Sequence, residues 1–251
     1  MRLLSYNIRH GGGGREKALA AVINQCEPDV VVLQEAVRPD VVERLSSACG
    51  MTQWACRPGY SVAFLSRLEV AHSEWRRSPF GRRHYLELVL AEQNLRIFGV
   101  HLSAIHSNVT ELRRVYELRS ILRETARCSQ TFHVLTGDFN TLANGEALDI
   151  ARLPFRLRAF LRVTGGRVRW RTIKLMAQAS YVDAFRSFHP LDSGYTFPTW
   201  DPHVRLDYLF APQQFASFVQ QCEVVRDGPV RDASDHFPLL SVITAPAKPR
   251  C

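Results

Sequence analysis

Residues 134–140 read Val-Leu-Thr-Gly-Asp-Phe-Asn, a short apolar run that changes abruptly into acidic and amide side chains. Gly137 predicts that a strand over Phe132–Thr136 ends here and presents Asp138 and Asn140 on the following turn. Similar apolar runs, rich in Val, Ile, Leu and Phe, recur on both sides and predict strands at Arg2–Ile8, Asp29–Gln34, Tyr60–Ser66, His84–Ala91, Leu95–Leu102, Arg205–Phe210 and Leu239–Ile243. Helical patterns alternate with them, which indicates a layered α/β protein.

The clearest helical pattern covers Val109–Arg127. Asn108 is positioned to cap it, and Glu111 stands where a reciprocal capping contact forms. Two further helices are predicted over Arg15–Cys26 and Asp40–Cys49.

Only Glu92, Gln93 and Asn94 separate the strands predicted at His84–Ala91 and Leu95–Leu102. So short a connection predicts a hairpin, which argues against a purely parallel, doubly wound sheet. The chain carries neither an internal repeat nor a linker rich in Pro, Gly or Ser, so we expect a single domain over residues 1–251.

The composition excludes several classes of protein. The chain has 251 residues, of which 46% are hydrophobic and 22% charged, as in an ordinary globular protein. No apolar run approaches the roughly 18 residues of a membrane span, and the first ten residues lack the apolar stretch of a secretory signal. Six cysteines without a Cys-x-x-Cys pair predict reduced thiols in a cytoplasmic protein.

The net charge of +8 belongs to one stretch of the chain. Residues 150–175 contain eight Arg or Lys and no acidic residue, so the other 225 residues balance at 24 against 24. We call residues 150–175 the basic segment. Its sequence favours two short helices broken at Gly165–Gly166, the second over Trp170–Ala179, with a β-hairpin as the alternative.

Polar side chains stand where the predicted strands end. Each has a simple structural explanation alone, as a turn former, a strand terminus or a hydrogen-bonded core histidine. Asp207 is more informative, because a carboxylate within an apolar strand must be paired if it is buried. The full set comprises Asn7, Glu35, His101, Asp138, Asn140, Asp207, Asp235 and His236.

These residue types suit metal-assisted attack of water on a phosphate ester. Mg²⁺ prefers oxygen ligands and is usually held by one or two carboxylates together with water and phosphate oxygens. Carboxylates or amides orient the water, and imidazoles stabilise the charged oxygens. We therefore expect Mg²⁺ as the cofactor, with Mn²⁺ as a substitute.

Six motifs, in order along nearly the whole chain, resemble those of the endonuclease/exonuclease/phosphatase superfamily. This superfamily includes DNase I, apurinic endonucleases, neutral sphingomyelinases and inositol polyphosphate 5-phosphatases. The motifs are Ser-Tyr-Asn-Ile-Arg at 5–9, Leu-Gln-Glu at 33–35, Val-His-Leu at 100–102, Gly-Asp-Phe-Asn at 137–140, Arg-Leu-Asp-Tyr-Leu-Phe at 205–210 and Ser-Asp-His-Phe-Pro-Leu at 234–239.

The resemblance implies a fold and a set of roles. The fold is a DNase I-like four-layer α/β sandwich, with two mixed sheets face to face and helices outside. Glu35, Asn7 and Asp235 would hold the metal. The implied catalytic residues are Asp138 and Asn140 for the water and the scissile phosphate, His236 oriented by Asp207, and His101 as the second imidazole.

Four further residues are candidates for substrate binding. Arg9 would reach a phosphate in a DNase I-like arrangement, and either Arg82 or Arg83 occupies the place of a phosphate-contacting arginine in some relatives. Trp200 belongs to an aromatic loop at 194–200 that either stacks on a base or packs within itself. Exonuclease III-type relatives generally lack a histidine at the position of His101, which argues against abasic-site repair.

The sequence thus predicts a Mg²⁺-dependent hydrolase of phosphoester bonds, foremost a phosphodiesterase acting on nucleic acid, and a monomer without an obligate protein partner. The basic segment follows the Asp138 turn, so we expect it near the cleft, where it would attract a polyanion. The alternatives are a lipid phosphodiesterase or phosphoinositide phosphatase at an anionic membrane surface, and a non-catalytic module that binds DNA or membrane. A solvated basic face that covers the core remains the structural explanation of the segment.

Overall fold

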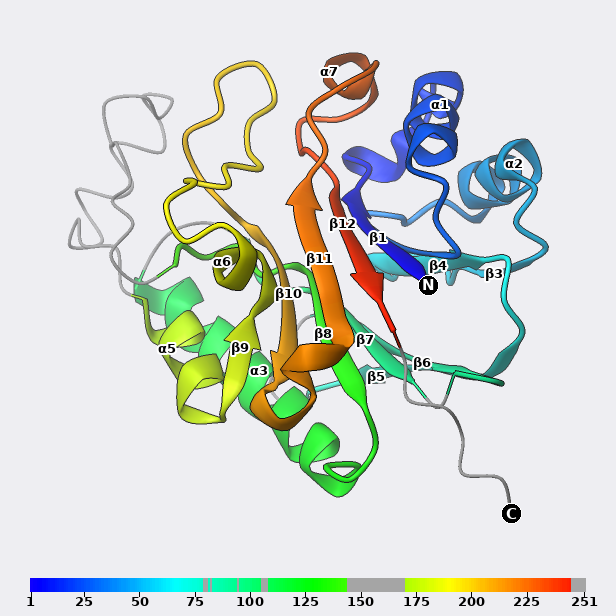
Figure 1. Cartoon of the computed structure of the whole chain (residues 1–251). Helices are drawn as coiled ribbons and strands as arrows, with labels where there is room; N and C mark the ends of the chain where they lie inside the picture. Colours follow the sequence, from blue (N-terminus) through cyan, green and yellow to red (C-terminus); the bar gives the residue numbers. More distant parts are fainter. Residues whose placement is uncertain (79–80, 82, 94, 105–107, 144–169, 245–251) are drawn as a thin grey trace.

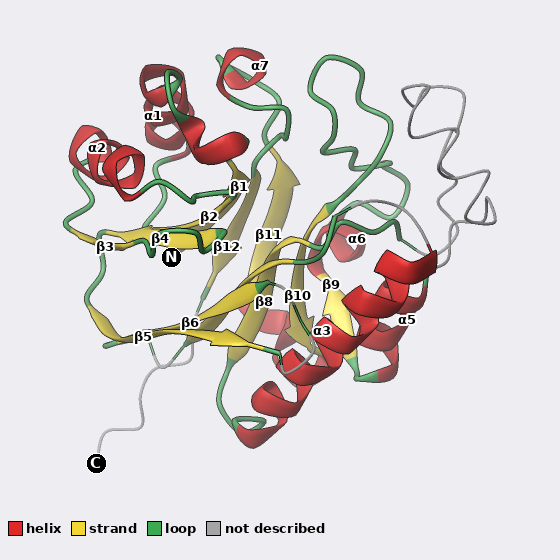
Figure 2. Cartoon of the chain, turned by 180° about the vertical axis from the view of Figure 1, so that it is seen from behind, coloured by secondary structure: helices red, strands yellow, loops and turns green. Residues whose placement is uncertain are grey.

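The computed structural model describes residues 1–78, 81, 83–93, 95–104, 108–143 and 170–244 (Figure 1). Two six-stranded sheets lie face to face, and helices cover their outer sides (Figure 2). The predicted four-layer α/β sandwich is confirmed. Along the described part of the chain, no helix is both long and apolar enough to cross a membrane.

The first sheet has the strand order β11-β12-β1-β2-β4-β3. Its strands β1 and β2 are parallel and all other neighbours are antiparallel, so the sheet is mixed. The strands are β1 (Arg2–Asn7), β2 (Val30–Gln34), β3 (Gln53–Ala55), β4 (Val62–Ser66), β11 (Val219–Val224) and β12 (Leu239–Ile243).

The second sheet has the order β5-β6-β7-β8-β10-β9, with β7 and β8 as its parallel pair. Strands β6 and β7 pair in antiparallel fashion, as the three-residue connection predicts. The strands are β5 (Val70–Arg77), β6 (His84–Leu90), β7 (Arg96–His101), β8 (His133–Asp138), β9 (Tyr181–Asp183) and β10 (Asp207–Pro212).

Helices cover each sheet on its outer face. Leu19 of α1 and Leu45 of α2 share a core with the first sheet, whereas Ile121 of α3 and Met176 of α5 pack on the second. The central strands are therefore covered on both faces, which explains why they are continuously apolar. The helices are α1 (Glu16–Cys26), α2 (Pro39–Cys49), α3 (Asn108–Arg127), α5 (Arg171–Gln178), α6 (Ala184–Phe188) and α7 (Val230–Ala233), with 3₁₀ turns η1 (His10–Gly12) and η3 (Gln213–Phe218).

The structure corrects one detail of the predicted elements and adds another. Gly137 does not end its strand: β8 continues to Asp138, and a Cβ atom at Gly137 would stand 2.0 Å from the carbonyl oxygen of Val100 on β7. Glycine thus permits the close pairing at this point. The carboxylate oxygens of Glu111 are bonded to Arg114, Thr141 and Thr172, and its capping contact with Asn108 stays a prediction.

Four strands lack a sequence prediction: β3, β5, β9 and β11. The helix predicted at Trp170–Ala179 is confirmed as α5, while the rest of the basic segment, with its predicted first helix or hairpin, lies outside the described residues. All five cysteines in the described part are free thiols.

Candidate active site

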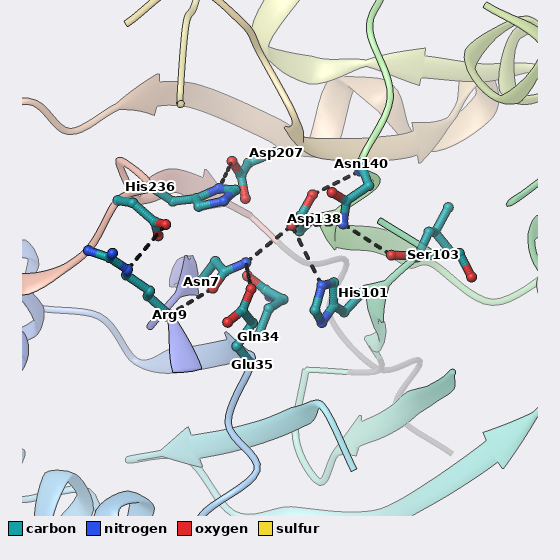
Figure 3. Close-up of polar contacts among 12 residues, drawn as sticks. Asn7, Arg9, Gln34, Glu35, His101, Ser103, Asp138, Asn140, Asp207 and His236 are labelled. Atoms are coloured by element: carbon teal, nitrogen blue, oxygen red, sulfur yellow. Dashed lines mark hydrogen bonds and ion pairs between the residues drawn. The ribbon is translucent and has the colours of Figure 1, made fainter. Parts of the chain in front are cut away.

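The predicted polar residues come together at one edge of the sandwich (Figure 3). Asn7 and His101 end strands β1 and β7, and Asp138 ends β8. Asp207 begins β10, which runs antiparallel to β8, and stands directly opposite Asp138 in the pairing. His236 precedes β12, which runs antiparallel to β1, so both sheets contribute side chains to the same edge.

Asp138 lies at the centre of this group and is 1% exposed. Its Oδ1 accepts a hydrogen bond of 2.8 Å from the Asn140 backbone, and its Oδ2 accepts bonds of 3.0 Å from Asn140 Nδ2 and 3.1 Å from Asn7 Nδ2. His101 Nε2 lies 3.8 Å from the same Oδ2. Burial, reinforced by the negative charge of Asp207, raises the pKa of Asp138 to about 7, although the charge of His236 and the hydrogen bonds oppose the shift.

His236 is bound to Asp207 through a contact of 2.8 Å between Nδ1 and Oδ2. Burial alone would lower the pKa of His236, but the charge and hydrogen bond of Asp207, with the charges of Asp138 and Asp235, raise it to about 10. The ring of Phe197 lies 4.8 Å from the imidazole, between centroids, and packs against it. His236 is therefore a fixed cation at neutral pH.

His101, unlike His236, is a neutral imidazole at neutral pH. Burial lowers its pKa well below the ordinary value, and the positive charges of Arg83 and His236 act in the same direction. Its Nδ1 is buried without a hydrogen-bond partner in the described part of the chain. One neutral and one charged imidazole thus surround Asp138, an arrangement that enzymes use to separate proton transfer from charge stabilisation.

Glu35 stands beside this centre in a left-handed backbone conformation, with φ of 56°. Its Oε2 accepts a hydrogen bond of 2.5 Å from the backbone N–H of His10, and its Oε1 lies 3.5 Å from Asn7 Nδ2. Strained backbone of this kind is typical of functional sites. The Glu35 side chain is 29% exposed, and the exposed His10 imidazole lies 3.5 Å from its Oε2.

The metal roles inferred from the family fall to Glu35, Asn7 and Asp235. The described residues include no group of three or more His, Cys, Asp or Glu that could hold a metal ion. Asp235 pairs with Arg9, 3.4 Å away, and the oxygen of Asn7 accepts from the Arg9 backbone at 3.0 Å. Glu35 fits Mg²⁺ as a hard oxygen donor, because Mg²⁺ needs only one or two carboxylates. The metal roles of Asn7 and Asp235 stay predictions.

Two of the candidate substrate residues, Arg9 and Trp200, lie beside each other. Trp200 is 62% exposed, and the Arg9 guanidinium lies 5.9 Å from the centre of its indole ring. Arg83 is half-buried, and its charge acts on His101. Arg82 lies outside the described residues.

Sequence reasoning missed two hydroxyl groups that hold the strand ends. Ser234 Oγ donates to the backbone oxygen of Asn7 at 2.6 Å and thereby connects the His236 turn to β1. Thr196 Oγ1 accepts from the backbone N–H groups of Leu206 and Asp207 at 3.0 and 3.3 Å. Ser234 begins the Ser-Asp-His-Phe-Pro-Leu motif, but its partner Asn7 is 227 residues away, so no local signal identifies the contact.

Comparison with known proteins agrees with this geometry. The model of the endonuclease/exonuclease/phosphatase family matches residues 4–236. The chain matches no curated protein.

Similar solved structures share the fold over almost the whole chain. They include the 3′ phosphatase NExo from Neisseria bound to product DNA hairpin, with TM-score 0.73 and 16% identity over 97% of this chain and 99% of that one. An AP endonuclease from Archaeoglobus fulgidus has a TM-score of 0.72 and 18% identity, over 97% of this chain and 99% of that one. A humanized D. rerio TDP2 has a TM-score of 0.68 and 17% identity, over 96% of this chain and 97% of that one.

The fold, the polar centre at its edge and the match over residues 4–236 lead to one conclusion: the chain belongs to the endonuclease/exonuclease/phosphatase family and is a hydrolase of phosphoester bonds.

Proposed function

We propose that this protein is a Mg²⁺-dependent phosphodiesterase that hydrolyses nucleic acid by attack of water. One observation carries the proposal: the cationic His236 and the neutral His101 flank the buried Asp138, whose pKa is about 7. A base that titrates near neutral pH, beside a fixed cation, suits hydrolysis of an anionic ester.

Each residue has a role that follows from its charge state. Asp138 would accept the proton of the attacking water, and Asn140, bonded to both of its oxygens, would hold the carboxylate in place. His236 would stabilise the charge on the phosphate oxygens, and Asp207 would keep it protonated. His101, neutral, would donate a hydrogen bond to a phosphate oxygen. Bound at Glu35, Mg²⁺ would supply Lewis-acid polarisation of the phosphoryl group.

Nucleic acid is the substrate class that the features of the chain favour. Arg9 and Trp200 offer a cation beside an exposed ring, a combination suited to phosphate and to a base or sugar. The solved structures of a Neisseria enzyme bound to product DNA and of an AP endonuclease support the same class. The cytoplasmic location, the monomeric state and Mn²⁺ as a substitute stay predictions.

A substrate panel tests the proposal. Wild-type protein would be assayed with Mg²⁺ and with EDTA on supercoiled plasmid, abasic duplex, single-stranded DNA, inositol phosphates and sphingomyelin vesicles. We expect Mg²⁺-dependent cleavage of at least one nucleic acid. Cleavage of vesicle lipid or of inositol phosphate without any nuclease activity would overturn the choice of substrate, and inactivity on every ester would favour the non-catalytic alternative.

A further inference from the structure

Three charged residues on α3 are almost completely buried behind the site. Glu111, Arg114 and Glu117 are 3%, 2% and 2% exposed, and we call them the α3 cluster. Burying charges is costly unless each is paired and hydrogen-bonded. Their partners therefore indicate which parts of the structure the cluster holds.

Two members of the cluster hold Ser103, which lies two residues beyond His101. Glu117 Oε2 accepts from the Ser103 backbone N–H at 3.0 Å, and Oε1 accepts from Ser103 Oγ at 2.7 Å. Arg114 Nη1 donates to the Ser103 backbone oxygen at 2.8 Å. The backbone and the side chain of Ser103 are thus both fixed to α3.

The third member connects the loop that carries Asn140 to helix α5. Glu111 Oε1 accepts from the backbone N–H and the hydroxyl of Thr172, at 2.8 and 2.9 Å, in the first turn of α5. Its Oε2 is paired with Arg114 at 2.7 Å and lies 3.4 Å from the hydroxyl of Thr141, the residue after Asn140. Helices α3 and α5 lie side by side against the second sheet (Figure 2).

The two held loops also meet at the site itself. Asn140 Nδ2 donates to the backbone oxygen of Leu102 at 3.0 Å and to Asp138 Oδ2 at 3.0 Å, with Ser103 close by (Figure 3). Asn140 therefore connects the two loops at the polar centre, and the α3 cluster connects them through the helix. A displacement of about 1 Å in such a centre costs on the order of 100-fold in rate.

We propose that the α3 cluster positions the catalytic loops of this enzyme. Glu117 and Arg114 set the place of His101 through Ser103, and Glu111 sets the place of Asn140 through Thr141 and α5. All three are positioning residues, since none contacts the reacting groups. This inference rests on the proposed function, because its kinetic test needs a phosphoester that the enzyme hydrolyses.

The test compares a variant of the α3 cluster and a variant of its partner Ser103 with a control on helix α3. Glu117→Gln removes a buried charge, and Ser103→Ala removes the hydroxyl that donates a hydrogen bond to Glu117. Thr125→Val is the control, because Thr125 is 2% exposed and accepts a hydrogen bond of 2.9 Å from the Tyr181 hydroxyl on β9, away from the polar centre. For each folded variant, kcat and KM on bis(p-nitrophenyl) phosphate, the melting temperature and the NMR signals of the Asn140 side-chain amide would be measured.

We expect Glu117→Gln to lower kcat roughly 10- to 100-fold and Ser103→Ala to lower it several-fold, with KM within about twofold of wild type. The Asn140 amide signals should move in both variants. Thr125→Val should lower the melting temperature while it leaves kcat and the Asn140 signals unchanged.

A purely structural cluster would give a different pattern: lower melting temperatures, with kcat and Asn140 signals as in wild type. That result would overturn the proposal. If Glu117→Gln fails to fold, Ser103→Ala decides by the same measurements. If the wild type hydrolyses no phosphoester, the proposed function fails, and unmoved Asn140 signals in the folded variants would then overturn the positioning role separately.

Discussion

His236 and His101 approach the same carboxylate, Asp138, from different surroundings. Asp207 bonds to His236 and keeps it charged, whereas the pKa of His101 is lowered by burial and by nearby positive charge. Tuning by neighbours lets one site hold a proton acceptor and a permanent cation at the same pH. The pair Asp207–His236 is therefore the residue-level feature on which the mechanism depends most.

Replacing Asp207 by Asn should remove the charge that keeps His236 protonated. We expect the pKa of His236 to fall and kcat at pH 8 to drop on the order of 100-fold or more, as when a histidine loses its orienting carboxylate. NMR titration of the His236 ring and steady-state kinetics would check both effects. Asp227→Asn, at an exposed position, is the control and should leave both unchanged.

Stability should fall as the pH rises above neutral. The pKa of His236 is about 10 in the folded state against an ordinary 6.5, so its contribution is complete below pH 6.5 and is lost as the pH rises through 10. Asp138, raised from 3.8 to about 7, acts in the same direction over a lower range. The free energy of unfolding should therefore fall as each of the two groups loses its proton.

Urea unfolding between about pH 6 and 10 measures this slope. A His236→Asn variant should give a clearly flatter curve in the alkaline range, because it lacks the group that titrates. The same slope in both proteins would mean that His236 does not carry the effect.

The residues of the centre were predictable because acidic, amide and imidazole groups stand at the ends of apolar runs. Their charge states were not, because burial and distant partners determine them. Glu111 shows the limit most clearly: its local sequence suits a helix cap, but nothing in it predicts that Thr172, 61 residues away, donates two hydrogen bonds to its Oε1. A partner so distant in sequence leaves no local signal.

At the scale of elements, the sequence predicts the inner strands and misses the edges. Strands β3, β5, β9 and β11 are the four edge strands of the two sheets. Edge strands pair on one side only and carry more polar side chains, as β5 does with His72, Glu74 and Arg77. Their apolar periodicity is too weak to recognise, whereas the doubly covered inner strands give clear runs.

The packing of the two sheets predicts the effect of a methyl group at Gly99. A Cβ atom there would lie 2.7 Å from Val32 Cγ1, across the interface between β7 and β2. Gly99→Ala should therefore lower the free energy of unfolding by about 1–3 kcal/mol, which urea unfolding would measure. Val32→Ala in the same chain should recover part of the loss, and strictly additive effects would contradict this account of the packing.

At the scale of the whole molecule, the charge is divided unevenly. Outside residues 150–175 the chain is neutral in sum, and that body contains the described catalytic centre. We expect the basic segment to bind the phosphate backbone of DNA.

Changing Arg152, Arg156, Arg158 and Arg162 to Gln should weaken DNA binding and make it less dependent on salt. The slope of log affinity against log salt concentration should become shallower by about 0.9 for each phosphate that is no longer neutralised. Hydrolysis of a small diester should stay unchanged, and an equal loss of binding and hydrolysis would indicate a structural role.

The proposed mechanism depends above all on Asp138, which activates water in a metal-dependent phosphoesterase. The most direct measurement is the rate of cleavage of a fluorescent DNA by wild type and Asp138→Asn, each with Mg²⁺ and with EDTA. We predict cleavage by the wild type that EDTA abolishes, and a rate for Asp138→Asn at least about 100-fold lower at equal folded concentration. Cleavage by Asp138→Asn at the wild-type rate would contradict the account.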